Sequence, residues 1–184
     1  MTAPDQLPSL GSLTSLPALD HPELLAPPVA KLLAAWPHAG EVAVVEIDPE
    51  LADTAAMTEA YDVPLEASAN CVVVMGRRGG EERTAACVVR ADTRADVNNV
   101  VRRVLDVRKC SFLDHDRAVA ETDMQYGGIT PIGRPPQWRL LIDETTTRID
   151  LAVVGSGVRG SKLFLPGRLF GELPGAEIVT DLAR

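Results

Sequence analysis

The chain is organised around one stretch, Tyr126-Gly127-Gly128-Ile129-Thr130-Pro131-Ile132-Gly133. Closely spaced glycines and a proline are incompatible with the interior of a helix or the middle of a sheet. Glycine adopts backbone angles that other residues avoid and lets a ligand approach the main chain, while proline fixes its own φ and favours an extended residue before it. The stretch therefore predicts a stiff loop that offers exposed backbone N–H groups.

A second glycine-rich turn follows two apolar strands. The segment 138–143 predicts one strand, and the segment 150–155 predicts another that ends in Gly155-Ser156-Gly157. Two glycine loops at the ends of apolar strands favour a pocket lined by main chain. A pair of tight turns without any ligand is the simpler interpretation of the same glycines, and the pattern alone favours it.

Outside these loops, short apolar runs alternate with helical patterns. Strands are predicted at 41–47, 71–75, 83–90, 138–143, 150–155, 161–165 and 176–179, and helices at 29–36, 48–61, 94–105 and 114–122. The runs 71–75 and 83–90 flank the turn Gly76–Gly80, a spacing typical of a hairpin. Strands predominate and helices lie between them, which indicates an α/β domain with a mixed sheet.

The first 28 residues differ from the rest of the chain. They are rich in proline, and leucines recur at every third position from Leu7 to Leu19. Because proline opposes a continuous helix, we predict a loose arm over residues 1–28, with leucines that can dock on a single domain spanning residues 29–184.

Charge is distributed unevenly. The net charge is −8, yet residues 1–70 hold one basic and eleven acidic residues, whereas residues 71–184 hold seventeen basic and fifteen acidic ones. The net negative charge of the protein argues against a broad phosphate-binding face, but it is compatible with a local basic patch within residues 71–184. Three cysteines without CxxC spacing indicate reduced thiols in a cytoplasmic protein. Neither a signal peptide nor a membrane span is expected.

Several familiar kinds of site are excluded by their missing motifs. The chain has no dinucleotide-binding G-x-G-x-x-G after a strand, no phosphate-binding G-x-x-x-x-G-K-[ST] and no G-x-S-x-G nucleophile elbow. Histidines and cysteines are not spaced as zinc ligands, so we expect no metal and no cofactor. His115 lies between two carboxylates at a predicted helix start and is expected to face water.

The charged residues near the loops have two interpretations each. Asp143 ends an apolar strand, where a carboxylate most often caps the next turn, although it can also orient a ligand amine. Basic residues gather after Gly76, and such residues usually form a solvated face. The concentration of these cations against an acidic first part nevertheless suggests a surface that contacts phosphates.

The order and spacing of four segments resemble the YbaK/EbsC family, also called the ProX or prolyl-tRNA-synthetase-associated domain. The resemblance extends from about Glu66 to Ala183. Gly127–Gly133 is similar to the family's G-G-x-[ST]-P-x-G loop, and the other three matching segments are Leu141–Glu144, Val153–Gly157 and Leu173–Val179. Four elements in the same order are far more specific than any one of them.

The resemblance implies a fold, an activity and a set of site residues. The fold would be a single α/β domain with a mixed, strongly curved sheet flanked by helices. The activity would be that of a free-standing trans-editing deacylase, which binds aminoacylated tRNA and hydrolyses the ester of a mischarged one without a metal or a histidine. The residues expected to line the pocket are Asn70, Gly127, Gly128, Thr130, Pro131, Asp143, Gly155, Ser156 and Gly157, with Arg159 and Lys162 as cations for the terminal nucleotides.

One position departs from the family pattern. Editing members carry a lysine in a K-[TS]-L pattern, and Asn70 stands where that lysine is expected. Asparagine donates hydrogen bonds but brings no charge, so the protein would be a slow enzyme or would use another cation such as Lys162. Two alternatives stay open: a non-catalytic protein that retains the fold for binding, and a hydrolase of small acyl esters unrelated to tRNA.

Overall fold

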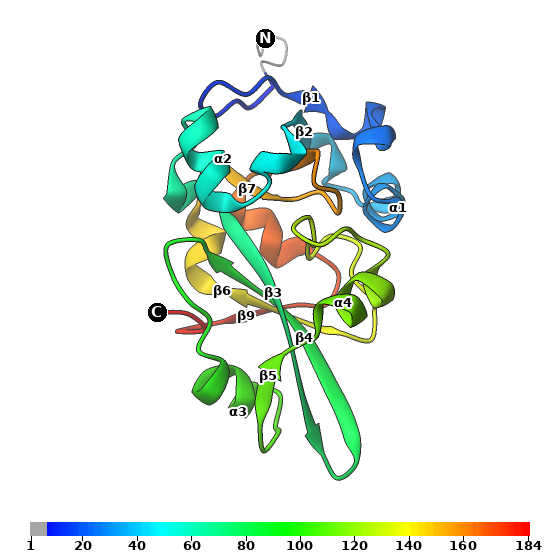
Figure 1. Ribbon diagram of the computed structural model, residues 1–184, viewed down its shortest axis with the longest axis vertical. Coiled ribbons are helices and arrows are strands. Elements are labelled where there is room, and N and C mark those ends of the chain that lie inside the picture. Colours follow the sequence, from blue (N-terminus) through cyan, green and yellow to red (C-terminus); the bar gives the residue numbers. More distant parts are fainter. Residues whose placement is uncertain (1–6) are drawn as a thin grey trace.

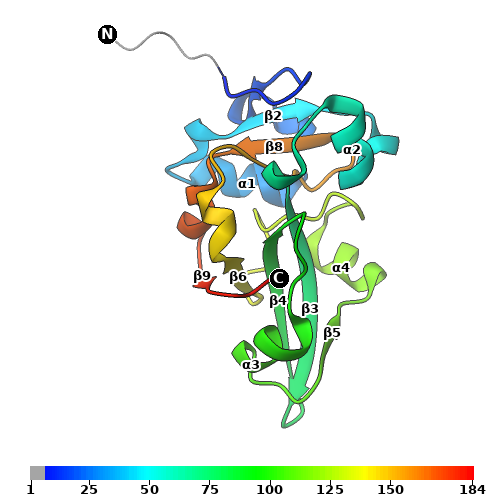
Figure 2. The same ribbon diagram turned by 90° about the vertical axis from the view of Figure 1, so that its left-hand side faces the viewer.

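The computed structural model describes residues 7–184, in which the strands form two sheets (Figure 1). The first sheet has the order β1-β2-β8-β7, and its neighbouring strands are antiparallel. Its strands are β1 (Leu16–Pro17), β2 (Ala43–Glu46), β7 (Ala152–Gly155) and β8 (Ser161–Leu165). Figure 2 shows β2 and β8 of this sheet at one end of the molecule.

The second sheet has the order β5-β3-β4-β6-β9 and is mixed. The central strands β3 and β4 are antiparallel, whereas β6 is parallel to both β4 and β9. Its strands are β3 (Ala69–Arg78), β4 (Glu81–Arg90), β5 (Cys110–Phe112), β6 (Arg139–Asp143) and β9 (Ala176–Val179). The mixed α/β class and the predicted strands from 138 onward are confirmed.

The predicted single, strongly curved sheet is corrected to two sheets. A short connection turns β7 back onto β8, so these strands satisfy each other's hydrogen bonds. Only one isolated bridge, between Ser68 and Val153, joins the two sheets among the described residues. The sheets are therefore separate layers that meet at the start of β3.

The long β3–β4 hairpin is confirmed, with one change at its turn. Arg78 pairs with Glu81, which leaves Gly79 and Gly80 as a two-residue turn, and both have positive φ. Gly76, predicted to lie in the turn, lies within β3. A Cβ at that position would come 2.5 Å from the carbonyl oxygen of Lys109, so glycine lets the chain entering β5 approach the hairpin.

Two predicted helices are shorter than their patterns indicated. Asp48 accepts a hydrogen bond from the Glu50 N–H, as predicted for a cap, but the turn it starts ends at Leu51, and α2 (Thr54–Tyr61) begins only after Asp53. The segment predicted as a helix at 94–105 is a π-turn (97–101) followed by the brief α3 (Arg102–Val104). By contrast, α1 (Pro27–Ala35) and α4 (His115–Thr122) lie close to their predicted bounds.

The N-terminal residues 7–28 pack against the first sheet. Strand β1 pairs with β2, and the side chains of Leu13, Ala18, Leu25 and Ala26 are buried. Leu25 and Ala26 join the largest apolar cluster, which also contains residues of α1, β4, β6 and β8. Residues 1–6 of the predicted arm lie outside the described residues. Among residues 7–184, no helix has the length and apolarity needed to cross a membrane.

Candidate functional site

A cavity of about 340 Å³ is lined by residues of α2, β3, β7 and α4, the elements labelled in Figure 1. Its walls come from both sheets, from the N-terminus of α2 and from the segment between β5 and α4. The lining residues used below are Asp53, Thr54, Asn70, Cys71, Phe112, His115, Tyr126, Gly127, Ile129, Gly155 and Lys162. A volume of this size fits a small ligand and a few waters.

The two glycine loops touch each other beside this cavity. The Gly157 N–H donates to the Gly128 carbonyl oxygen at 2.8 Å, and the Gln125 N–H donates to the Gly157 carbonyl oxygen at 2.8 Å. A Cβ on Gly155 would come 2.5 Å from the Gly128 oxygen. These glycines therefore allow two stretches of backbone to approach closely.

Two of the loop amides already have partners inside the protein. The Gly128 N–H donates to the Gln125 carbonyl oxygen, and the Gly157 N–H is used as described above. Gly127 and Ile129 are lining residues of the cavity, and the N–H groups of both donate no hydrogen bond to another group within residues 7–184. These two amides are therefore the candidate donors to a ligand.

The predicted site residues fall into two sets. Asn70, Gly127, Gly155 and Lys162 line the cavity. The residues outside its lining are Gly128, Thr130, Pro131, Asp143, Ser156, Gly157 and Arg159. Of these, Ser156 is fully buried, and its hydroxyl bonds to the carbonyl oxygen and the hydroxyl of Ser161, so it braces the second loop from inside.

Asp143 and Arg159 hold the fold together locally. The Asp143 carboxylate caps the next turn by accepting from the Thr145 N–H, and its other oxygen accepts from the Ala183 N–H at 2.9 Å. The guanidinium of Arg159 donates to the carbonyl oxygens of Pro49 and Tyr126. Arg159 thus fastens the glycine loop to the segment before α2.

Asn70 is oriented by the helix opposite. Thr54, the first residue of α2, donates its hydroxyl proton to Asn70 Oδ1 at 3.0 Å. This bond leaves the amide nitrogen Nδ2 as the donor that Asn70 offers to the cavity. An uncharged donor thus occupies the place at which the resemblance leads us to expect a lysine.

Lys162 brings a positive charge into the cavity wall from β8. Its side chain is buried, and burial lowers the pKa of the ammonium below its ordinary value, partly offset by the Asp53 carboxylate. Within the described residues, Lys162 forms no ion pair closer than 4 Å. Burying a cation without a close partner costs free energy, so Lys162 lowers the stability of the folded protein.

Asp53 adds the opposite charge at the cavity's edge. It occupies the residue before α2, but its side chain makes no capping hydrogen bond. Cys71, by contrast, contributes no charge, because burial raises the pKa of its thiol to about 12. The cavity therefore presents one cation, one exposed carboxylate and neutral donors.

Sequence reasoning missed seven of the lining residues named above: Asp53, Thr54, Cys71, Phe112, His115, Tyr126 and Ile129. Tyr126 and Ile129 belong to the first glycine-rich stretch and Cys71 follows Asn70, which were usable signals. The other four follow from where α2, β5 and α4 begin and end. His115 is exposed, as expected, but at the cavity mouth, where its ring lies 4.2 Å from the ring of Tyr126.

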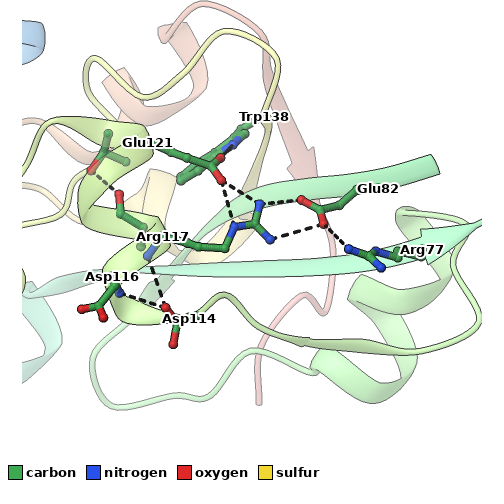
Figure 3. A network of polar contacts seen from close by, with 9 residues as sticks. Arg77, Glu82, Asp114, Asp116, Arg117, Glu121 and Trp138 are labelled. Carbon is green, nitrogen blue, oxygen red and sulfur yellow. Dashed lines mark hydrogen bonds and ion pairs between the residues drawn. The ribbon is translucent and has the colours of Figure 1, made fainter. Parts of the chain in front are cut away.

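A network of charges fixes α4 to the hairpin (Figure 3). Arg117 donates to Glu82 on β4 at 2.6 Å and to Glu121 one turn along α4 at 2.7 Å. Glu121 also accepts from the indole N–H of Trp138 at 3.1 Å. Arg117 is the main reason that the pKa of Glu82 is lowered. The network positions the helix whose first residue is His115.

The predicted basic surface is neutralised in part: nine of the seventeen cations after Gly76 form ion pairs within residues 7–184. Many of its arginines form ion pairs with carboxylates, including Arg139 with Glu177 and Arg168 with Glu41. Among residues 7–184, no group of three His, Cys, Asp or Glu side chains is placed to share a metal ion. Within the described residues, Lys162 is the one lysine or arginine of the cavity lining, and Arg159 lies close enough to act on its charge.

Comparisons with known proteins agree with the resemblance in the sequence. Residues 48–171 match the family model described as "Aminoacyl-tRNA editing domain". The chain is similar to the crystal structure of a hypothetical protein at a TM-score of 0.74 and 17% identity, covering 85% of this chain and 99% of that one. It is also similar to a "putative trans-editing enzyme for prolyl tRNA synthetase" at a TM-score of 0.69 and 16% identity, with coverages of 85% and 97%.

The same fold occurs inside a longer protein. A chain from Marinobacter aquaeolei matches 85% of this one over 30% of its own length, at a TM-score of 0.57 and 14% identity. Identities this low establish a shared architecture, while the family match covers most of the chain, including both glycine loops, Asn70 and Lys162. The protein therefore belongs to the family of aminoacyl-tRNA editing domains.

Proposed function

We propose that this protein is a trans-editing deacylase, which hydrolyses the ester between a small amino acid and the 3′ end of a mischarged tRNA. The observation that carries the proposal is the cavity of about 340 Å³, which combines a buried cation with free amide donors. Water adds to the ester carbonyl, the bond to the ribose oxygen breaks, and the products are the free amino acid and the tRNA hydroxyl.

The charges of the cavity match those of this reaction. An oxyanion develops on the carbonyl oxygen of the ester, and the Lys162 ammonium together with the N–H groups of Gly127 and Ile129 would stabilise it. Asp53 would bind the substrate's α-ammonium group at the cavity's edge. Asn70, held by Thr54, would orient the ester through Nδ2. Lys162 would thus supply from β8 the charge that Asn70 lacks on β3.

Selectivity would follow from size. The cavity walls consist of packed strands and helices, so their shape would limit which side chains can enter without rearrangement. Small amino acids would reach the reactive position, while the correctly charged, larger one would be excluded, as in double-sieve editing.

The test is deacylation of a panel of mischarged tRNAs by the wild type and by Lys162→Met. We expect turnover above buffer with at least one small aminoacyl group and a loss of about tenfold or more in the variant. No turnover with any member of the panel would remove the enzymatic proposal.

The alternative is a binding protein that has kept the fold and lost editing activity, and the absent lysine motivates it. If the wild type shows no deacylation, the variant Asn70→Lys distinguishes a decayed enzyme from a binding protein with a remodelled site. A gain of deacylation would identify a decayed enzyme, whereas no gain would identify a remodelled binding site. Hydrolysis of small acyl esters would show a rate insensitive to salt, because tRNA binding weakens as salt rises.

A further inference from the structure

Exposed aromatic rings gather at the mouth of the cavity. Phe112 is 65% exposed and Tyr126 is 54% exposed, and both line the opening. The other phenylalanines and both tryptophans are buried: Trp36, Trp138, Phe164 and Phe170. A single exposed aromatic residue needs no explanation, but the two most exposed ones share one opening.

Two of the side chains at this opening lie ring against ring. The imidazole of His115 lies 4.2 Å from the ring of Tyr126, with 34° between their planes. Phe112 ends β5, and His115 begins α4 three residues later. Phe112, His115 and Tyr126 are called the aromatic rim below.

The surrounding structure holds the rim in place. Asp114 caps α4 by accepting from the Asp116 and Arg117 N–H groups, which fixes the helix end that carries His115. The Tyr126 carbonyl oxygen accepts from the Arg159 guanidinium. The rim is therefore built on anchored elements, although its side chains face solvent.

The chemistry adjacent to the cavity suggests what the rim binds. If the cavity holds the ester, the nucleoside that carries the ester must lie at its mouth. The 3′ end of tRNA is single-stranded, and proteins recognise unpaired bases by stacking them on aromatic side chains and histidine. We propose that the aromatic rim stacks the terminal nucleobase of the substrate, an inference that rests on the proposed function.

Electrostatics strengthens the argument for stacking. The chain carries a net charge of −8, and many of its arginines are paired with carboxylates. Long-range attraction of tRNA phosphates is consequently weak. Stacking does not depend on net charge, so it can supply affinity where phosphate contacts are few.

The experiment measures binding of an uncharged RNA acceptor-stem hairpin that ends in CCA, labelled at its 5′ end, by fluorescence anisotropy. A second hairpin has an abasic ribose in place of the terminal adenosine. We expect removal of the adenine to weaken binding to the wild type by about 5- to 100-fold. In Tyr126→Leu and Phe112→Leu, which keep apolar bulk but lose the ring, that penalty should shrink.

Ile178→Ala is the matched control, because Ile178 is 56% exposed and lies outside the cavity. It should retain the full adenine penalty. An equal penalty in the wild type and in both ring variants would overturn the inference, as would the absence of any penalty in the wild type. Loss of self-association in the ring variants, without any adenine dependence, would assign the rim to a protein contact instead.

The two proposals can fail separately. Deacylation of mischarged tRNA without adenine-dependent binding would leave the proposed activity standing and remove the base-stacking rim. The reverse result is a protein that does not deacylate tRNA but shows adenine-dependent binding, which the ring variants lose. It would support the aromatic rim and remove the enzymatic proposal.

Discussion

The Lys162 side chain carries the main positive charge of the cavity, and the fold does not neutralise it with a close carboxylate. Buried charges without partners are rare unless they act on a ligand. The sequence suggested Lys162 as a replacement cation, and the structure places it in the cavity wall. Substituting Lys162 tests whether its charge serves the reaction or the stability of the fold.

Lys162→Met should reduce deacylation and increase stability. Because burial lowers the folded-state pKa of Lys162 below its unfolded value, the folded protein incurs a free-energy cost to keep the ammonium charged at neutral pH. That cost disappears as pH rises from the lowered pKa to the ordinary lysine pKa, so wild-type stability should rise relative to the variant across this window.

Thermal unfolding at neutral pH checks this, with an expected gain on the order of 1 kcal/mol for the variant. Lys31→Met removes an exposed lysine of α1 and should change neither property. A variant that is less stable than the wild type would show that the charge is compensated in the fold.

The bond from Thr54 to Asn70 should matter for the substrate rather than for the fold. Thr54→Val removes the donor that orients the Asn70 amide, so we expect a several-fold rise in KM with little change in the thermal midpoint. Thr58→Val is the matched control on the same helix, because the Thr58 hydroxyl is buried without a partner among the described residues. Steady-state deacylation kinetics of both variants separate the roles, and equal effects would contradict this assignment.

At the scale of elements, strands were easier to predict than helices. The apolar runs within β3, β4, β6, β7 and β8 are long enough to predict strands, although β3 and β8 also carry Asn70 and Lys162. The patterns at 48–61 and 94–105 predict helices, yet both are interrupted. In the second, the N–H groups of residues 94 and 96 bond to carbonyl oxygens of residues 184 and 182. The break at Asp53 places this carboxylate at the cavity's edge, which no local propensity could indicate.

The Arg117 network should position α4 more than it stabilises the protein. Arg117→Met removes the contacts to Glu82 and Glu121, and ion pairs that water reaches contribute little to stability. We expect a small drop in the thermal midpoint together with a clear rise in KM, because His115 begins this helix.

Lowering the pH should reproduce part of the effect of Arg117→Met. The pKa of Glu82 is lowered in the fold, so its stabilising contribution is present above the unfolded pKa and is lost as pH falls through the folded pKa. Arg148→Met, which breaks the exposed pair with Glu144, is the control and should leave KM unchanged. Melting curves and kinetics on both variants distinguish positioning from a general loss of stability.

At the scale of the whole molecule, residues 7–28 should behave as part of one folding unit. Leu13 is 6% exposed and packs with residues of β2 and β7, whereas Leu19 is 48% exposed. Leu13→Ala should therefore lower the free energy of unfolding by about 2–4 kcal/mol, and Leu19→Ala should have almost no effect.

Chemical denaturation of the two variants checks this, with a single cooperative transition expected in each. Equal and small effects would support the loose arm that the prolines suggest. A separate early transition in Leu13→Ala would mean that the N-terminal residues unfold independently of the sheets.

The sequence by itself determined the strands, the hairpin, the glycine loops and the family, because these depend on local patterns: apolar runs, positive-φ turns and motif spacing. Only the tertiary structure decided that the strands form two sheets and that Lys162, Asn70, Asp53 and the aromatic rim surround one cavity. It also showed that the glycines of the two loops serve backbone contact, with the amides of Gly128 and Gly157 already bonded. The physical reason is that a cavity depends on side chains brought together over long sequence separations, and no local pattern encodes that proximity.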